Sequence, residues 1–599
     1  MLDPDDRSIY TDALTPPAGM VFEKGIAATY SLDISTLMTI PIQLCLAGTG
    51  RQKELLADGI TLLDSLRRTV SNLCVFCERG RIAVPGEKHF LYSMLEQVIV
   101  EALAPAGGAF HPKFWLLKYI DPKDSTDSVY RLMILSRNIT QDRSWDVATT
   151  IDGRRIDSSV ESNAKLMRFL KAFPGMAVGS ASERTSKIVE ELSSELEYVE
   201  WKLPDGFYDI RFHVPGTADG NWMPEDSASM VVVSPFLADE TLRQLAQTTR
   251  EPLALVSRSE EMALVSPEVL ALFKKNLVLH EAAEQEEGEE VEATEIGLHA
   301  KLYIFKEWHN THVVLGSANA TVPALLNGSN IELLVELIGK SSSVGRPEDF
   351  LSSEAGIGEV IVDFDPEMYP AGSDENGLDE RRKIDYLRKF LVKSGLSISC
   401  MDLEGSYRME LVSDRSIAVH EGIEVRVWPI TVDQQKAYLF NGLNEGEKFI
   451  LPEVDVASIT GFIAFELKLQ DICERFVLNL PITGVPEERE SAILKTVIEN
   501  REGFIRYLRM LLSGIHDAGT DIAGGLFGSG WFRRATGSED ALLEHLVLAL
   551  SRDPGKLNTI SNLIEELRQD EKCEDIFPEG FLEMWSVFEN VMAEMNDQD

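Results

Sequence analysis

The chain has 599 residues, of which 44% are hydrophobic, and a formal net charge of −41 at pH 7. This hydrophobic content is ordinary for globular proteins and excludes a chain that is disordered throughout, and the length suffices for three or four domains. No apolar run is long enough to span a membrane, the N-terminus is acidic where a signal peptide is basic, and the six cysteines are scattered. We therefore expect a cytoplasmic protein with reduced thiols and no membrane contact.

The first region, residues 1–200, contains a polar motif between apolar runs. Cys74 and Cys77 flank an apolar pair without a second Cys or His partner at metal-ligand spacing, which favours a buried strand over a redox or zinc half-site. The motif begins with His111 and Lys113 inside the apolar run 109–117. A second apolar run follows and ends in the polar residues Ser136, Arg137, Asn138 and, further on, Asp146.

The second region, residues 201–345, repeats this order. It opens with an apolar run at 230–233, which predicts a buried strand leading into a turn. The motif residues are His299, Lys301, Ser317, Asn319 and Glu332. Because residues i and i+2 share a face of a strand, His299 and Lys301 are predicted to point together, while Leu298 and Ala300 pack behind them. Two copies of strand, strand, Ser/Asn turn and trailing acid indicate an internal duplication.

Three further regions follow. Residues 346–395 contain a polar stretch at 371–377 and predict a linker and a helix. Residues 396–484 show the period-two alternation of half-buried antiparallel strands, for example at 423–428 and 465–469, which predicts a β-sandwich. From 485 to 599 apolar residues recur at helical spacing and predict a helical domain, in which the glycine-rich segment 524–530 is interpreted as a loop.

At these motifs the chain resembles the phospholipase D superfamily, over about residues 25 to 345. The resemblance implies an α/β fold in which duplicated α-β-α domains place two His-x-Lys motifs on a pseudo-two-fold axis, forming one phosphoryl-transfer site. Many members have Asp five residues after the motif lysine, whereas this chain has Lys118 and Lys306 there. The tyrosyl-DNA phosphodiesterase branch shares this departure, and segment 136–146 resembles that branch too. The resemblance therefore favours nucleic-acid phosphodiesters over lipids.

Two histidines are the minimum set for a reaction that proceeds through a phosphohistidine. A neutral imidazole attacks phosphorus, and a second, protonated imidazole donates to the leaving oxygen. Lys113, Lys301, Asn138 and Asn319 are predicted to donate to the non-bridging oxygens, so that no metal or other cofactor is required. The resemblance implies His111 as the nucleophile, His299 as the acid and base, and Glu332 and Asp146 as the acids that orient them. Ser136, Ser317 and Arg137 are predicted to bind substrate.

The negative charge of the chain is the main objection to a nucleic-acid substrate, because polyanion binding normally uses clustered Lys and Arg. A local basic cluster near the first motif is expected to offset it; its members are Lys113, Lys118, Lys123, Arg131, Arg137, Arg143, Arg154, Arg155, Lys165, Arg168 and Lys171. The alternative is a partner protein that captures the nucleic acid. The acidic segment 281–295 enters the second motif and is either an exposed mobile loop or a gate that occupies the phosphate site.

The function that these patterns favour is a metal-independent phosphodiesterase, a nuclease acting on DNA ahead of RNA. The chain has no ATP motif of its own. The proteins that accompany members of the family it resembles suggest a defence or repair subunit that works beside a helicase-like ATPase. A non-catalytic assembly subunit is the alternative, disfavoured because both His/Lys/Asn sets are complete. A phospholipid-cleaving enzyme is less favoured still, since no membrane-facing stretch stands out and anionic lipid surfaces repel an acidic protein.

Overall fold

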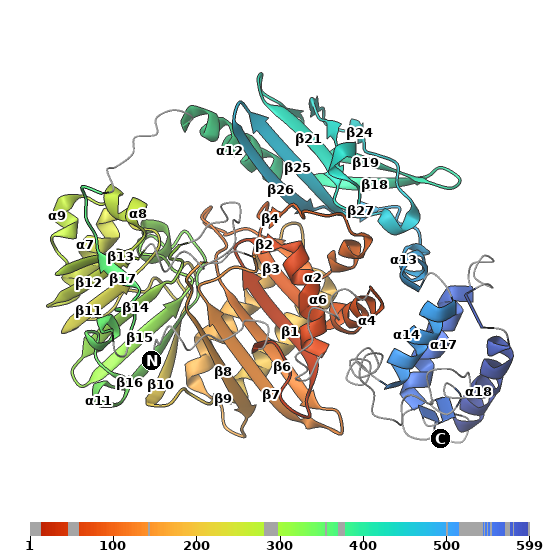
Figure 1. Cartoon of the computed structure of the whole chain (residues 1–599), viewed down its shortest axis with the longest axis horizontal. Helices are drawn as coiled ribbons and strands as arrows, with labels where there is room; N and C mark the ends of the chain where they lie inside the picture. Colours follow the sequence, from red (N-terminus) through yellow and green to blue (C-terminus); the bar gives the residue numbers. More distant parts are fainter. Residues whose placement is uncertain are drawn as a thin grey trace.

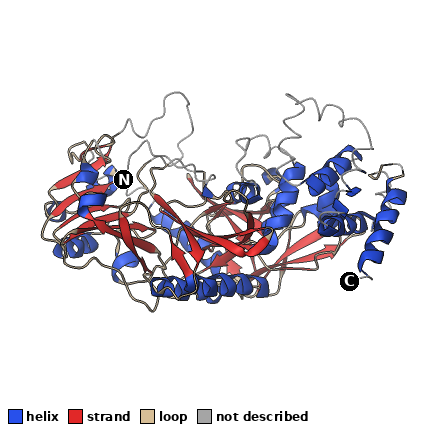
Figure 2. Cartoon of the chain, turned by 90° about the horizontal axis from the view of Figure 1, so that it is seen from below, coloured by secondary structure: helices blue, strands red, loops and turns tan. Residues whose placement is uncertain are grey.

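The computed structural model describes residues 13–45, 59–141, 144–280, 297–353, 356–368, 378–498 and 501–513, and of the remainder 543, 546–547, 549–550, 554–568, 576–578 and 580–596. Figure 1 shows two large sheets beside each other, a further β-rich part above them in cyan, and helices in blue at the C-terminal end. In the turned view of Figure 2 the molecule is elongated, with strands through most of its length and helices gathered near the C-terminus. The fold is therefore of the mixed α/β kind.

The first large sheet has seven strands in the order β5-β3-β1-β6-β7-β8-β9. They are β1 (Val21–Thr29), β3 (Leu73–Glu78), β5 (Ile99–Ala102), β6 (Phe114–Asp121), β7 (Asp124–Leu135), β8 (Ala148–Arg155) and β9 (Val199–Trp201). Strand β3 contains Cys74 and Cys77, both fully buried, which confirms the buried strand predicted there.

Helices cover both faces of this sheet because its strands are apolar on both sides. They are α2 (Ile34–Cys45) and α4 (Gly59–Thr69) on one face, and α5 (Ala164–Lys171) and α6 (Glu183–Glu195) on the other. Successive side chains of β1 alternate between the faces: Ala27 joins the core of α2 and α4, whereas Ile26 and Ala28 join the core of α5 and α6.

The second large sheet has eight strands in the order β10-β16-β15-β14-β11-β12-β13-β17. They are β10 (Phe207–His213), β11 (Ser229–Val233), β12 (Pro252–Ser257), β13 (Lys275–Leu279), β14 (Leu302–Glu307), β15 (Asn310–Gly316), β16 (Leu334–Lys340) and β17 (Ile361–Asp363). Strand β11 is buried along its whole length, as predicted. The short helices of this part are α7 (Asp239–Gln247), α8 (Ser259–Leu264), α9 (Pro267–Leu270) and α11 (Ser341–Val344).

The two sheets share one pattern over six neighbouring strands. The order β5-β3-β1-β6-β7-β8 in the first corresponds to β13-β12-β11-β14-β15-β16 in the second. In both, the first three strands are parallel and the last three are joined by antiparallel pairs. Thus β6 corresponds to β14, and β7 to β15. Side chains of both sheets, such as Leu116 and Ile304, belong to one continuous apolar core.

The β-rich part consists of two main sheets around a separate core. The four-stranded sheet contains β18 (Leu396–Asp402), β19 (Tyr407–Ser413), β24 (Lys448–Ile450) and β27 (Ile482–Thr483). The six-stranded sheet contains β2 (Leu32–Asp33), β4 (Ile82–Ala83), β21 (Glu424–Pro429), β22 (Tyr438–Leu439), β25 (Phe462–Leu469) and β26 (Ile472–Asn479). A small pair is formed by β20 (Ile417–Ala418) and β23 (Gly442–Leu443), and the preceding helix is α12 (Leu378–Lys393).

This six-stranded sheet is not built from residues 396–484 alone, because β2 and β4 come from the first hundred residues. A buried ion pair strengthens the junction: Arg79 Nη1 lies 2.7 Å from Glu101 Oε2, and Arg79 Nε donates to Val392 O. Glu101 also accepts from the backbone amide of Asn479 on β26. The β-rich part is therefore attached directly to the edge of the first large sheet, at β5.

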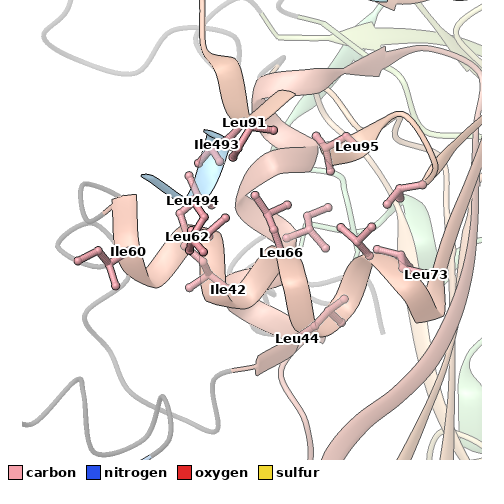
Figure 3. Close-up of a cluster of buried hydrophobic side chains, with 14 of the residues drawn as sticks. Ile42, Leu44, Ile60, Leu62, Leu66, Leu73, Leu91, Leu95, Ile493 and Leu494 are labelled. Atoms are coloured by element: carbon pink, nitrogen blue, oxygen red, sulfur yellow. The ribbon is translucent and has the colours of Figure 1, made fainter. Parts of the chain in front are cut away.

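The C-terminal helices extend the core that α2 and α4 begin. They are α13 (Arg489–Ile498), α14 (Arg501–Ser513), α17 (Pro554–Arg568) and α18 (Phe581–Asn596). Figure 3 shows Ile493 and Leu494 of α13 next to Leu62 of α4. Within the residues that the structure describes, no helix is both long and apolar enough to cross a membrane. The loop interpreted at 524–530 lies outside those residues.

Candidate active site

Both motifs lie at equivalent places at the ends of strands. The sequence predicts the motif histidines on strands, but strands β6 and β14 begin at Phe114 and Leu302, so His111 and His299 lie in the segments just before them. The difference arises because the backbone of these segments pairs with the opposite half of the chain. Leu298 and Ala300 are nevertheless buried behind, in the predicted manner. Strands β7 and β15 end at Leu135 and Gly316 and lead directly into the Ser/Asn turns.

Backbone pairing connects each motif to the opposite half of the chain. A parallel bridge joins Phe110 to Ile331, and the amide of His111 donates to Ile331 O at 2.9 Å. A second parallel bridge joins Trp145 to Leu298, and the amide of His299 donates to Trp145 O at 2.9 Å. Each histidine is thus held next to the acid-bearing segment of the other half.

The side chains follow this crossed arrangement. His111 Nδ1 lies 2.9 Å from Glu332 Oε2, and His299 Nδ1 lies 3.1 Å from Asp146 Oδ1. The His111 and His299 side chains are 12% and 16% exposed, whereas Glu332 is fully buried. A carboxylate at Nδ1 holds the Nδ1–H tautomer, which leaves the Nε2 lone pair of each neutral ring for chemistry.

Two buried lysines lie beside the rings. Lys113 Nζ is 2.9 Å from His111 Nε2, and Lys301 Nζ donates to His299 O at 2.7 Å. Both side chains are fully buried. Burial and the charge of Lys301 hold the pKa of Lys113 well below its usual value, against the opposing effect of Glu332 and Asp146. As an ammonium, Lys113 donates to Nε2 of a neutral His111.

Burial also shifts the pKa values of the two histidines. It lowers the pKa of His111 to about 4, although Glu332 opposes the shift, and it lowers the pKa of His299 to about 4, although Asp146 opposes it. Each ring also experiences the charge of the lysine from the other motif, Lys301 for His111 and Lys113 for His299. The two motifs therefore form one electrostatic site.

The two acids remain ionised. Burial alone would raise the pKa of Glu332, but His111, Lys113 and Ser317 outweigh it and hold the pKa below its usual value. The pKa of Asp146 is lowered in the same way, since His299, Ser136 and Lys301 outweigh its burial. Two anionic carboxylates thus balance two lysines around the neutral imidazoles.

The serines occupy places that differ from the predicted ones. Ser136 Oγ donates to Asp146 Oδ1 at 2.8 Å, Ser317 Oγ donates to Glu332 Oε2, and both residues are fully buried. Side chains behind the carboxylates are shielded from substrate. We therefore assign Ser136 and Ser317 to the support of Asp146 and Glu332, in place of the predicted substrate binding. Arg137 donates to Thr140 O, within its own turn.

The two motif asparagines differ from each other. Asn138 Oδ1 is 3.4 Å from the amide of Ser31 and 3.5 Å from Thr29 Oγ1, so its oxygen is engaged by donors and its NH₂ group remains to donate. Asn319 is 9% exposed, and its Oδ1 is buried without a hydrogen-bond partner among the described residues. Because amide oxygen and nitrogen are interchangeable by rotation, this end of Asn319 suits donation to a phosphate oxygen.

Three residues of the site were missed by the sequence prediction. The ring of Tyr30 lies 5.0 Å from that of His111, Asn330 donates to Glu332 Oε1 at 3.1 Å, and Glu78 accepts from the amide of Phe110 at 2.7 Å. Burial raises the pKa of Glu78 to about 7. Asn330 had a visible signal, since it precedes Glu332 by two residues; Tyr30 and Glu78 lie on segments distant from the motif in sequence.

The predicted basic cluster is partly neutralised. Carboxylates within ion-pair distance contact five of its members: Lys118 (Glu23 and Glu195), Arg131 (Asp152), Arg154 (Asp127), Arg168 (Asp219) and Lys171 (Glu190). These side chains therefore do not form a free surface for a polyanion. Arg143 and the acidic segment 281–295 lie outside the described residues.

Other polar clusters have structural roles. His213 Nε2 and His312 Nδ1 both contact Glu336, at 2.6 and 2.5 Å, on neighbouring strands of the second sheet. In the part of the chain that the structure describes, no group of three or more His, Cys, Asp or Glu side chains is arranged to hold a metal ion.

No protein-family model matches the chain, and no curated protein matches it by sequence. Among solved structures, yeast tyrosyl-DNA phosphodiesterase is similar at 10% identity with a TM-score of 0.33, over 55% of this chain and 85% of that one. A mutant of the yeast enzyme is similar at 11% identity with a TM-score of 0.33, over 56% and 87%. Phosphatidylserine synthase of Haemophilus influenzae is similar at 9% identity with a TM-score of 0.31, over 64% and 89%.

At identities and TM-scores this low, the likeness decides neither substrate nor mechanism.

Proposed function

We propose that the chain is a metal-independent phosphodiesterase, a nuclease acting on DNA, whose two motifs form one catalytic site through internal duplication. The observation that carries the proposal is the crossed pairing of His111 with Glu332 and of His299 with Asp146. Histidines held by carboxylates from opposite halves, with two buried lysines between them, suit an anionic group that accepts a nucleophile on one side and a proton on the other.

In the first step, His111 Nε2 attacks phosphorus and the bond from phosphorus to the leaving oxygen breaks. His299 donates its Nε2 proton to that oxygen, and His111 becomes a phosphohistidine. Lys113 moves its hydrogen bond from His111 Nε2 to a non-bridging oxygen, where negative charge develops. Lys301, Asn138 and Asn319 donate to the same oxygens.

In the second step, water attacks the phosphohistidine. His299, now neutral, takes a proton from that water, and the P–N bond to His111 breaks. This restores His111 as a neutral base and His299 as an acid. The cycle leaves one product with a free hydroxyl and the other with a phosphate monoester.

The assignment of His111 as nucleophile is supported by its contact with Lys113. An ammonium donating to Nε2 requires a lone pair on that nitrogen, and a lone pair is what attack needs. Because burial lowers the pKa of His299 to about 4, it is neutral in the free protein at pH 7. An entering phosphodiester anion raises that pKa, so we propose that substrate binding is accompanied by proton uptake at His299.

The proposal extends to the biological setting, by analogy with the family that the chain resembles. It places the chain in the cytoplasm as a defence or repair subunit that acts with a helicase-like ATPase. Ion pairing of five members of the predicted basic cluster supports a partner that delivers the nucleic acid.

The experiment is cleavage of single-stranded and duplex DNA and RNA in excess EDTA by the wild type, His111→Ala and His299→Ala. His309→Ala, at an exposed hairpin position, is the matched control. We expect cleavage by the wild type and the control and a loss of at least about 10³-fold in both site variants. A phosphohistidine is stable in alkali and labile in acid, so trapping with end-labelled substrate and a denaturing alkaline quench should label His299→Ala more than His111→Ala. Activity that persists in both site variants would contradict the proposal.

A further inference from the structure

Two arginine–aromatic pairs flank the site. The guanidinium carbon of Arg81 lies 5.3 Å from the ring centre of Tyr30, and that of Arg258 lies 5.2 Å from the ring centre of Phe236. Each pair combines an apolar aromatic face with a delocalised cation, at a distance typical of a cation–π contact.

Both pairs lie in the segments that follow corresponding strands of the two sheets. Tyr30 follows β1 and Phe236 follows β11, and these strands correspond to each other. Arg81 follows β3 and Arg258 follows β12, which also correspond. The same pattern of bridges secures both turns: Leu32 pairs with Ile139, next to the first motif asparagine, and Leu237 pairs with Ala320, next to the second.

Both pairs lie beside the catalytic residues. The ring of Tyr30 lies 5.0 Å from the ring of His111 and 5.7 Å from Lys113 Nζ. Arg258 Nε donates to the carbonyl of Leu298, the residue before His299. One pair therefore borders the His111 side of the site, and the other borders the His299 side.

The arginines of these two pairs differ from the neighbouring basic residues in their ion-pair partners. Among the described residues, neither Arg81 nor Arg258 forms an ion pair, whereas Lys118, Arg131 and Arg168 are each paired with carboxylates. Phe236 is 38% exposed, although it is a large apolar side chain beside a polar site. The exposed ring of Phe236 and the half-buried ring of Tyr30, each beside a guanidinium group, are surfaces on which a planar group can stack.

We propose that the Tyr30–Arg81 and Phe236–Arg258 pairs are stacking platforms for the two bases on either side of the scissile phosphate. This inference rests on the proposed function and adds a substrate class, unpaired strands. Aromatic rings stack on any base, because every base has a π-face, and guanidinium groups add a cation–π contribution. A base in a duplex is already stacked and paired, so two platforms across one phosphate select single strands.

The test compares two substrates with the same backbone charge. One is a single-stranded oligothymidylate, and the other is an oligomer of equal length whose residues are abasic. For the wild type we expect kcat/KM to be at least about tenfold higher on the oligothymidylate. Phe236→Ala should lower kcat/KM on the oligothymidylate by about 10-fold and change cleavage of the abasic oligomer less than about twofold, and Tyr30→Ala should lower kcat/KM on the oligothymidylate by about 10-fold more than on the abasic oligomer.

Two further variants complete the design. Phe236→Trp keeps an aromatic face and should retain the preference for bases, while Trp308→Ala removes an exposed aromatic residue in the β14–β15 turn and should change neither substrate. Equal losses on both substrates would mean that Tyr30 and Phe236 only position the site, and would overturn the inference while the phosphodiesterase stands. A wild type that cleaves both substrates equally well would overturn it too. A wild type that cleaves neither would overturn the proposed function itself.

Discussion

Glu332 lies 2.9 Å from Nδ1 of His111, although 221 positions separate the two residues in the chain. The reciprocal contact joins Asp146 to His299 over 153 positions. Each histidine thus takes its tautomer and its orientation from the half of the chain to which it does not belong. This relation leads to a first prediction.

Replacing Glu332 by Gln, or Asp146 by Asn, should lower kcat by roughly 10²- to 10⁴-fold with little change in KM. An amide that donates to Nδ1 forces the proton onto Nε2, which is the wrong tautomer for attack. The measurement is steady-state cleavage of oligonucleotide, with the exposed Glu260→Gln as the control. A variant in which KM rises and kcat is unchanged would show that these carboxylates bind substrate and do not orient the rings.

The lowered pKa values of the histidines predict an acid-sensitive fold. Since burial lowers each pKa to about 4, an unfolded chain takes up protons below about pH 6.5 while the folded chain does not. Stability is then lost as the pH falls from about 6.5 to 4. Between pH 7 and pH 4.5 the free energy of unfolding of the wild type should fall by about 2 kcal/mol more than that of His111→Asn, and likewise by about 2 kcal/mol more than that of His299→Asn. Urea denaturation at each pH measures this, and parallel curves would contradict the prediction.

Lys113→Met should separate stability from activity. Because burial holds the pKa of Lys113 well below its usual value, its ammonium costs folding free energy, and a methionine of similar size removes that cost. We expect an unchanged or higher melting temperature together with a loss of about 10²- to 10³-fold in kcat.

The matched control for this variant is Lys118→Met. Lys118 contacts Glu23 and Glu195, and its pKa is raised because these hydrogen bonds outweigh its burial. The control should lose stability, by up to about 1 kcal/mol, and keep its activity. If both variants behave alike, the charge of Lys113 has no special role.

Leu494→Ala should test the packing of α13 against α4. Leu494 is fully buried next to Leu62, so its truncation leaves a cavity and should cost about 2–5 kcal/mol. The exposed Thr496 on the same helix provides a control, Thr496→Ala, with an effect below about 0.5 kcal/mol. Equal melting temperatures for the two variants would show that α13 is not held by this contact.

Much of the site was predictable because the motif repeats. The spacing of His299 and Lys301, the apolar residues behind them and the strand ending at Gly316 are local patterns with a period of two. The crossed pairing of Asp146 and Glu332 is not a local pattern, since it depends on how two halves dock. The same reason explains the serines: sequence places Ser136 and Ser317 near the site but does not say that their hydroxyl groups turn toward buried carboxylates.

The basic cluster shows the opposite case, because the sequence pattern predicts a larger positively charged surface than the structure has. Lys118, Arg131 and Arg168 stand within one stretch of chain, yet their partners Glu195, Asp152 and Asp219 lie on other segments. Likewise, period two predicts the strands of the β-rich part, but β2 and β4 join its sheet from the first hundred residues. Contacts between distant segments decide both outcomes.

The crossed carboxylates also bear on how the protein is made. While the ribosome is still synthesising the second half, His111 and Lys113 have already emerged, but Glu332 does not yet exist to hold the ring. A partly synthesised or truncated chain therefore carries a histidine with no acid behind it and no second histidine opposite. The arrangement in which each histidine is held by a carboxylate of the other half is complete only when both halves have been synthesised and folded together.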